Sequence, residues 1–278
     1  MAGIFDGLEQ FGLDAGADLF GSQKEQKKAE PTAPLHTEGE FVLDKTFTCP
    51  VCDASFKAKV MKTGKARMVS QDHDTRPRFE YVDPMKYDAI MCPTCGYATM
   101  GRYFSNITAS QAKLVRTGIC SKFVSQSDST AEFYTYEYAR KRYKMALACT
   151  MVKQSKASEM AYLLLRMGWL VRGEYESLDQ NRPDYTDKVI MLQKEEEQCL
   201  TKALEGFCKA RGEESFPIAG MDENTLDYII SQLAARFGKY DLASQLVSKL
   251  LASHSVNARM KDNLLELKET IIRTKKES

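Results

Sequence analysis

Two cysteine pairs are the residues of this chain whose types and spacing point most directly to chemistry. Cys49 and Cys52 form one Cys-x-x-Cys motif, and Cys92 and Cys95 form the second. Such a motif turns two sulfur atoms toward one side of a tight loop, and structural zinc takes four ligands in a tetrahedron. The 39 residues between the pairs exceed the usual spacing of about 15–20. The two pairs together nevertheless predict a closed four-cysteine site that holds structural rather than catalytic zinc.

A run of basic residues follows the first cysteine pair. No acidic residue lies between residues 54 and 71. If this stretch begins with a strand, Lys57 and Lys59 share one face and Phe56 and Ala58 the other. That face could contact nucleic-acid phosphates, but we favour a solvated strand surface, because no aromatic side chains alternate with the lysines to stack on bases. The candidate nucleic-acid contacts are Lys57, Lys59, Lys62, Lys65 and Arg67.

A second polar stretch, Asp72-His73-Asp74, stands close to Arg76 and Arg78. Two carboxylates beside an imidazole could bind a second metal ion or act as a general base. We favour the alternative, a turn whose carboxylates accept backbone hydrogen bonds and pair with the arginines. The chain has three histidines and lacks the nucleophile and phosphate-binding motifs of common enzyme classes. We therefore expect no enzymatic activity.

The other four cysteines lie in stretches with helical periodicity, where we expect packed thiols. They are Cys120, Cys149, Cys199 and Cys208. Paired cysteines in a reducing compartment indicate metal ligands rather than disulfides, so we expect a cytoplasmic protein. One alternative stays open: the chain could be a thiol redox sensor in which oxidation of a cysteine pair releases zinc.

The first forty residues predict an acidic tail and a flexible linker. Residues 1–23 contain four acidic residues and no Lys or Arg, which excludes a secretory signal peptide. Ile4, Leu8 and Phe11 fall at helical spacing, so this segment is either a tail or a docking peptide. Residues 21–40 have the polar, proline-containing composition of a linker. No apolar run approaches the roughly 18 residues of a membrane span, and we expect no membrane contact.

Composition and periodicity predict an α+β fold that is mainly helical. The 278 residues are 43% hydrophobic and 28% charged, as in ordinary globular proteins. A net charge of +1 excludes a strongly basic protein that coats nucleic acid. Residues 41–104 alternate with a period of two and predict a small β module of the zinc-ribbon type, with strands around both cysteine pairs and a turn at Gly64. Residues 105–278 switch to a helical period.

Seven helices joined by short turns are expected in the second part, which implies antiparallel hairpins. Residues 127–130, Ser155 and Asp222 supply N-cap candidates for the second, third and fifth helices. The expected helices cover about 107–124, 131–152, 156–179, 184–211, 223–237, 239–252 and 256–275.

Two of these helices carry the small–aromatic–small pattern of tetratricopeptide repeats. Ala139, Tyr143 and Ala146 show it, and Ala203, Phe207 and Ala210 show it again. A third, looser match begins at Ala243. The separations of 64 and 40 residues differ from the repeat length of about 34. We therefore expect a degenerate, tetratricopeptide-like domain, with a generic bundle of helical hairpins as the alternative.

At this point the chain resembles an uncharacterised bacterial family, one of the domain-of-unknown-function families. Its members carry an N-terminal zinc ribbon followed by tetratricopeptide-like helices. Asp83 and Asp53 depart from the Asn and Gly usual there, and neither change removes a metal ligand. Weaker similarity continues through Trp169 and Arg172. The motifs that carry the resemblance are Cys49-Pro50-x-Cys52, Arg67…Asp72-x-Asp74 and Asp83-Pro84-x-x-Tyr87-Asp88…Cys92-Pro93-x-Cys95-Gly96-Tyr97-Ala98. The resemblance implies a bacterial, metal-binding protein with no established activity.

Three functions follow from these observations. The first is a non-enzymatic, zinc-binding protein–protein interaction module, because arrays of helical hairpins expose concave surfaces that bind peptides. The second is nucleic-acid or ribonucleoprotein binding through the basic run, and the third is redox sensing. We expect a protein partner, which the sequence does not identify, and a zinc ion without which a β module of this size has too small a core.

Overall fold

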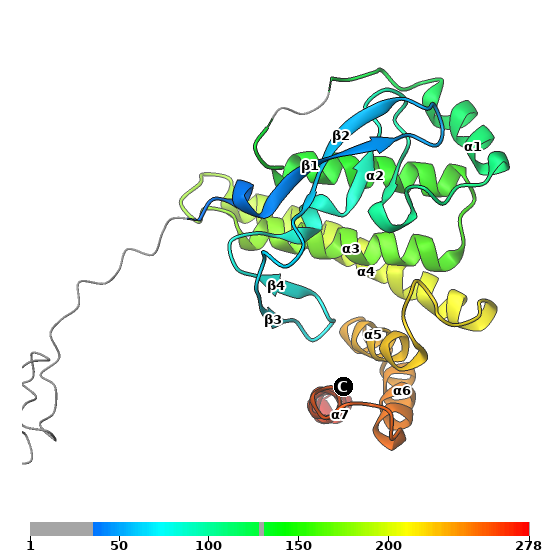
Figure 1. Ribbon diagram of the computed structural model, residues 1–278. Coiled ribbons are helices and arrows are strands. Elements are labelled where there is room, and N and C mark those ends of the chain that lie inside the picture. Colours follow the sequence, from blue (N-terminus) through cyan, green and yellow to red (C-terminus); the bar gives the residue numbers. More distant parts are fainter. Residues whose placement is uncertain (1–35, 128–130, 278) are drawn as a thin grey trace, which may run out of the picture. The chain divides into compact units, whose positions relative to one another are not determined.

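Strand pairs come first and helices follow, in the order that the sequence predicts (Figure 1). The structure is a computed structural model, and it describes residues 36–127 and 131–277. The predicted acidic tail and most of the linker, residues 1–35, lie outside the described residues. The last part of the predicted linker forms the 3₁₀-helix η2 (Glu38–Phe41). The mainly helical α+β fold class is confirmed.

The strands of the described residues form three separate two-stranded antiparallel sheets. The pairs are β1 (Val42–Thr48) with β2 (Ser55–Met61), β3 (Met68–Gln71) with β4 (Pro77–Phe79), and β5 (Ala89–Met91) with β6 (Ala98–Met100). The turn at Gly64 therefore separates β2 from β3 without pairing them, which alternation alone did not reveal. Pairing runs instead across the two Cys-x-x-Cys turns, so each cysteine pair lies at the tip of a hairpin.

A proline begins one of the short strands. Pro77 is the first residue of β4. A proline is tolerated at the first position of an edge strand, because no ladder hydrogen bond needs its missing N–H there.

Helices form the rest of the described chain, and the first predicted helix is divided into a short α-helix and a π-helix. These elements are α1 (Ala109–Val115), the π-helix η5 (Arg116–Cys120), α2 (Tyr136–Val152), α3 (Ala157–Glu176), α4 (Tyr185–Glu213), α5 (Glu223–Arg236), α6 (Tyr240–Ala252) and α7 (Ala258–Glu277). Helix α3 packs against both α2 and α4, and the three run beside one another in Figure 1.

The first two α-helices begin where a threonine can cap them. The Thr108 hydroxyl accepts a hydrogen bond from the Gln111 N–H at 3.2 Å. The Thr135 hydroxyl accepts one from the Tyr138 N–H at 3.2 Å. Helix α2 therefore starts at Tyr136 with Thr135 as its N-cap, five residues later than the sequence predicted. Most of the expected cap cluster, residues 128–130, lies outside the described residues. A threonine cap of this kind stabilises a helix by about 1 kcal/mol.

A distant carboxylate helps to cap α3, where the sequence predicted Ser155. Glu214, just after α4, accepts hydrogen bonds from the backbone N–H and the hydroxyl of Ser158 at 2.9 and 2.6 Å. The cap of α5 is confirmed, since Asp222 accepts from the Thr225 N–H at 2.7 Å. A local cap was predictable from sequence, whereas a cap contributed by another helix was not.

The hairpins and the helices share one hydrophobic core. Residues 37–278 form one compact unit. Phe56 and Tyr97 of the hairpins lie in the same buried cluster as Tyr143 of α2 and Leu163 of α3. The Tyr143 hydroxyl donates to the Met85 carbonyl at 3.0 Å, so α2 is tied directly to the segment that precedes the second cysteine pair.

The small–aromatic–small positions of α2 all point into this core. Ala139, Tyr143 and Ala146 have no exposed surface. The tetratricopeptide-like assignment itself stays a prediction. No helix within the described residues combines the length and the apolar character that a crossing of a lipid bilayer requires.

Candidate metal centre

The four predicted ligand cysteines come together at the tips of two hairpins. Their Sγ atoms all lie within 4.8 Å of one another. Cys49 Sγ lies 3.6 Å from Cys95 Sγ, and Cys52 Sγ lies 3.7 Å from Cys92 Sγ. A tetrahedral ion with metal–sulfur bonds of about 2.3 Å holds its sulfur atoms about 3.8 Å apart. The spacing of the thiols therefore fits one tetrahedrally coordinated ion.

The same local geometry builds both turns. The backbone N–H of Asp53 donates to the Cys49 carbonyl at 2.9 Å, and the N–H of Gly96 donates to the Cys92 carbonyl at 3.0 Å. Both donors have left-handed backbone conformations, with φ of 60° at Asp53 and 76° at Gly96. Glycine adopts this conformation freely, and aspartate adopts it at modest cost.

Burial and mutual hydrogen bonding perturb the thiols. Cys49 and Cys92 have no exposed surface, and Cys95 is buried. Hydrogen bonds from Cys49 and Cys95 lower the pKa of Cys92 to about 2. The hydrogen bond with Cys92 raises the pKa of Cys49 to about 12, and that with Cys49 raises the pKa of Cys95. Because metal binding requires thiolates, a metal ion taken up here would displace the protons that the thiols share.

A helical segment covers the second turn. The Phe123 ring lies where a Cβ atom on Gly96 would be, within 2.5 Å of that position. The Gln126 N–H donates to the Pro93 carbonyl at 2.9 Å. The Arg116 Nε donates to the carbonyl of Val51 in the first turn at 2.8 Å. Residues 116–126 therefore hold both cysteine turns from one side.

Cys149 supports the second turn from the helical side. Its Sγ accepts a hydrogen bond from the Ala98 N–H at 3.3 Å and donates to the Gly96 carbonyl at 3.6 Å. Burial raises the pKa of Cys149 to about 11, so it stays a neutral thiol that can donate. The sequence predicted only a packed thiol here. Its role beneath the turn depends on a contact across 53 residues, which no local pattern signals.

The donor set indicates which metals suit this centre. Four sulfur ligands in a tetrahedron favour zinc or an iron centre over magnesium or calcium, which prefer oxygen. Four protein ligands leave no open coordination position, which is typical of structural sites. The cluster is compatible with a bound metal ion, and its thiols would hold that ion between the β1–β2 and β5–β6 hairpins.

The predicted nucleic-acid contacts lie along β2 and the loop after it. Lys59 is buried, and its ammonium group donates to Asp44 at 3.0 Å. The ammonium group of Lys62 donates to the backbone carbonyl of Glu40 at 2.8 Å. Two of the five cations are therefore engaged within the fold. The exposed ones are Lys57, Lys65 and Arg67. Contact of this face with nucleic acid stays a prediction.

The acidic stretch at residues 72–74 is bound to arginines. Arg172 of α3 donates to Asp72 at 2.9 Å and to Asp74 at 2.6 and 3.1 Å. The Trp169 Nε1 also donates to Asp74, at 3.1 Å. The structural interpretation of this stretch is confirmed, and Trp169 lies in the core. Within the described residues, the cysteine cluster is the group with metal-ligating spacing, and these carboxylates are not part of it.

This stretch belongs to a larger arginine–carboxylate network that joins the β3–β4 hairpin to three helices. Arg172 also donates to Glu196 of α4 at 2.8 Å. Arg236 of α5 reaches the same carboxylate at 2.8 Å. The network consists of Asp72, Asp74, Asp83, Glu176 and Glu196 with Arg76, Arg78, Arg172 and Arg236. Sequence reasoning named Arg172 only as a point of family similarity and predicted no partner for any of the helical members.

No curated protein and no solved structure matches this chain. One family model matches residues 42–271, which include all four clustered cysteines, the β3–β4 hairpin and the helices as far as most of α7. That family is DUF2225, described as an uncharacterized protein conserved in bacteria. The match spans far more than half of the chain, and the protein therefore belongs to this uncharacterised bacterial family.

Proposed function

We propose that this chain is a non-enzymatic protein–protein interaction module whose cysteine hairpins are fixed by one structural zinc ion. Four thiols at the separation of tetrahedral ligands support zinc. A closed site of this kind adds folding energy and no open position for a substrate. Binding of the partner is therefore assigned to another surface.

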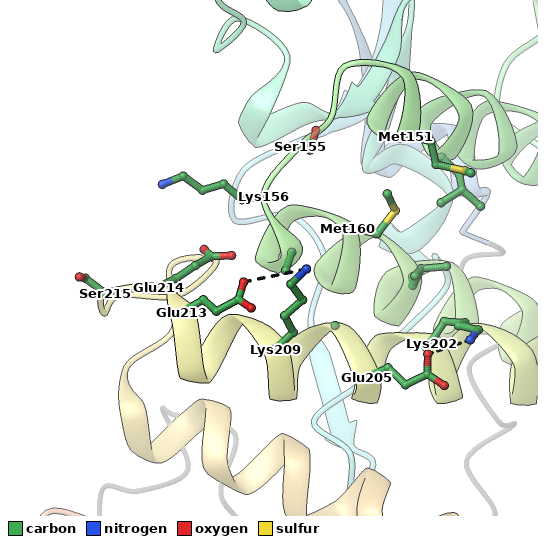
Figure 2. Close-up of a pocket in the computed structure, with 14 residues that line it drawn as sticks. Met151, Ser155, Lys156, Met160, Lys202, Glu205, Lys209, Glu213, Glu214 and Ser215 are labelled. Carbon is green, nitrogen blue, oxygen red and sulfur yellow. Dashed lines mark hydrogen bonds and ion pairs between the residues drawn. The ribbon is translucent and has the colours of Figure 1, made fainter.

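The observation that carries the proposal is a wide groove between α2, α3 and α4, named here the α2–α4 groove (Figure 2). Its volume is about 1110 Å³. Leu147, Met151, Ala157, Met160 and Leu164 supply its apolar surface. Charged side chains form its rim, and they are Lys156, Lys202, Glu205, Lys209, Glu213 and Glu214.

The chemistry of the groove suits a protein ligand. Met151 is 63% exposed and stands beside the other apolar residues of the groove, and a contiguous exposed apolar surface rimmed by charges is typical of a protein-binding site. Methionine side chains are flexible and polarizable, so they adapt to the apolar surface of a partner. The lining contains serines and charged Lys and Glu side chains but no His, Cys or Asp, so it lacks the histidine or cysteine of common nucleophilic sites. These features support a binding role over an enzymatic one.

The two alternatives have less support. Nucleic-acid binding would use the exposed part of the basic run, but the ammonium groups of Lys59 and Lys62 already have acceptors within the fold. Redox sensing would oxidise a cysteine pair of the cluster itself, but Cys49 and Cys92 have no exposed surface and Cys95 is buried, so an oxidant has little access to them. Cys120 is the half-buried thiol beside them, and burial raises its pKa, which makes it a poor nucleophile. Neither alternative has a surface comparable with the α2–α4 groove.

Site-specific photocrosslinking in cells tests the proposal. A benzophenone amino acid replaces Met151 in the groove, and the matched control replaces Met191, which is 47% exposed on α4 outside it. We expect discrete protein adducts at the first position only, unchanged by nuclease treatment. Equal labelling at both positions would contradict the groove as the binding surface. Adducts that nuclease removes would move the proposal to nucleic acid.

A further inference from the structure

We infer that the α2–α4 groove takes an amphipathic α-helix of about three turns from a partner protein, with a carboxylate of that helix beside Lys156. The inference rests on the proposed function and adds the shape and the charge of the partner segment. It follows from the spacing of the lining residues and from the state of the charges on the rim.

The walls of the groove are helical ridges, and the natural complement of helical ridges is another helix. Leu147 and Met151 of α2 stand four residues apart. Ala157, Met160 and Leu164 of α3 stand three and four apart. Side chains at these intervals share one face of a helix and leave grooves into which the ridges of a further helix pack. An extended peptide would instead need a strand edge for its backbone hydrogen bonds, and the groove offers none.

The length of the groove sets the length of its ligand. Lining residues on α4 run from Lys202 to Glu213, which at 1.5 Å per residue is about 16 Å. Three turns of α-helix have the same length. Gly206 lies midway along this wall, where an added Cβ atom would come within 2.9 Å of Ala161 Cβ. Helices α3 and α4 are therefore in close contact here and form a continuous surface under the ligand.

Within the part of the chain that the structure describes, one cation of the rim has no ion-pair partner. On α4, Lys202 pairs with Glu205 at 2.7 Å, and Lys209 pairs with Glu213 at 4.0 Å. Both oxygens of Glu214 are taken up by Ser158. Figure 2 shows these side chains along the α4 edge and Lys156 on the other side.

Lys156 is exposed and forms no ion pair with any described residue. Glu214 already caps the N-terminus of α3, so the ammonium group of Lys156 is the charge that a carboxylate on the partner helix would meet. The alternating Lys and Glu on the α4 edge can pair with either charge, so acidic character is required at the Lys156 side alone.

A random 16-residue peptide library displayed on phage, selected on the full chain, tests the inference. We expect enriched peptides with apolar residues three and four apart and an acidic flank. The best of them, synthesised with a fluorophore, should bind at least tenfold more weakly to Met151→Glu and about three- to tenfold more weakly to Lys156→Glu. Binding should be unchanged in the controls Met191→Glu and Lys141→Glu, which alter exposed positions outside the groove. A proline at the centre of the peptide should cost about 100-fold, because proline breaks a helix.

Each other result overturns a stated part. Peptides that tolerate the proline but are lost with Met151→Glu would overturn the helix and leave the proposed function intact. Peptides whose affinity is unchanged by Lys156→Glu would overturn the inferred carboxylate of the partner helix. A library that yields no peptide sensitive to Met151→Glu would overturn the inference and the groove function together. If sedimentation shows a dimer that Met151→Glu dissolves, the occupant is a second copy of the chain, and the partner helix is overturned. Circular dichroism and metal content of each variant confirm that it is folded.

Discussion

Replacing Arg172 with methionine tests the role of the arginine–carboxylate network. The guanidinium group of Arg172 makes four hydrogen bonds of 2.6 to 3.1 Å to three carboxylates. Methionine has a similar unbranched stem and fills much of the same volume, but it supplies neither charge nor donors. The substitution therefore removes one partner from buried carboxylates while it keeps most of the packing.

The expected loss follows from what each carboxylate retains. Glu196 keeps Arg236 at 2.8 Å and Tyr175 at 2.8 Å. Asp72 keeps an ion pair with an arginine of its own hairpin. Asp74 is 8% exposed and keeps only neutral donors. Breaking a buried ion pair by removing one partner costs about 3–5 kcal/mol. Because Asp74 is the one carboxylate of the three that is left without a cation, we expect the free energy of unfolding to fall by about 3 kcal/mol.

Urea unfolding measures this loss, and the chain provides its own probe. Trp169 is the single tryptophan and donates to Asp74, so its fluorescence reports on the network itself. Circular dichroism at 222 nm reports on the helices. Coincident transitions would justify a two-state free energy of unfolding. The matched control is Arg182→Met, because Arg182 forms an exposed pair with Asp184 at 2.5 Å. Such exposed pairs contribute little to stability.

Two results would refute this reasoning. A loss below about 1 kcal/mol in Arg172→Met, equal to that in Arg182→Met, would show that the carboxylates gain other partners or water. Full stability in Arg172→Lys would show that the planar guanidinium group with its several donors is not needed, since lysine keeps the charge but cannot reach three carboxylates. The lysine variant also keeps the test decisive if the methionine variant fails to fold.

Three further expectations concern the cluster, its turn and the pH. Metal analysis should find one zinc ion per wild-type chain and none in the Cys92→Ser variant, whereas the control Cys208→Ser should keep the ion. A wild-type protein that is folded without metal would exclude a structural zinc ion. Gly96→Ala should lower the free energy of unfolding by about 1–3 kcal/mol, because φ is 76° and the added Cβ atom meets a phenyl ring. In the control Gly212→Ala the added Cβ atom meets no other atom, so this variant should be neutral or slightly stabilising in the same urea assay. Burial would raise the pKa of Glu196, but the hydrogen bond from one arginine and the charge of another outweigh it and lower that pKa. A carboxyl group with a lowered pKa stabilises the fold at pH values above its unfolded pKa of about 4.3, and it ceases to do so as the pH falls through its folded pKa. The free energy of unfolding should therefore drop between pH 5 and pH 3. A flat pH profile would contradict this.

The four-cysteine cluster was predictable because its information is local. A Cys-x-x-Cys turn fixes two sulfur atoms within four residues, and the left-handed residue after each second cysteine is readable from Asp53 and Gly96. Alternation then located β1, β2 and β5. The alternation with a period of two did not reveal which strands pair. Gly64 has the sequence of a hairpin turn, yet β2 pairs backward across Cys49 and Cys52, because the cysteine turn is the tighter closure.

The network and the groove were not predictable because they depend on distant residues. Asp72 and Asp74 were recognised as a polar turn, but their partner Arg172 lies about 100 residues away on a helix whose sequence reads as core. Its neighbours Leu170 and Val171 have no exposed surface, and nothing in the helical period marks the arginine between buried positions as paired. The groove depends on the packing of three helices, which periodicity does not fix.

Helix α2 links the metal centre to the groove. Cys149 holds the second cysteine turn on one face of this helix, and Leu147 and Met151, two residues to either side, line the groove on the other. Removing the metal ion should loosen the hairpin that Cys149 supports and with it one wall of the groove. Chelation should therefore weaken peptide binding, with recovery on addition of zinc. The Cys92→Ser variant should bind weakly with or without chelator. If chelation leaves the affinity unchanged, the helices hold the groove by themselves, and the metal ion stabilises the hairpins alone.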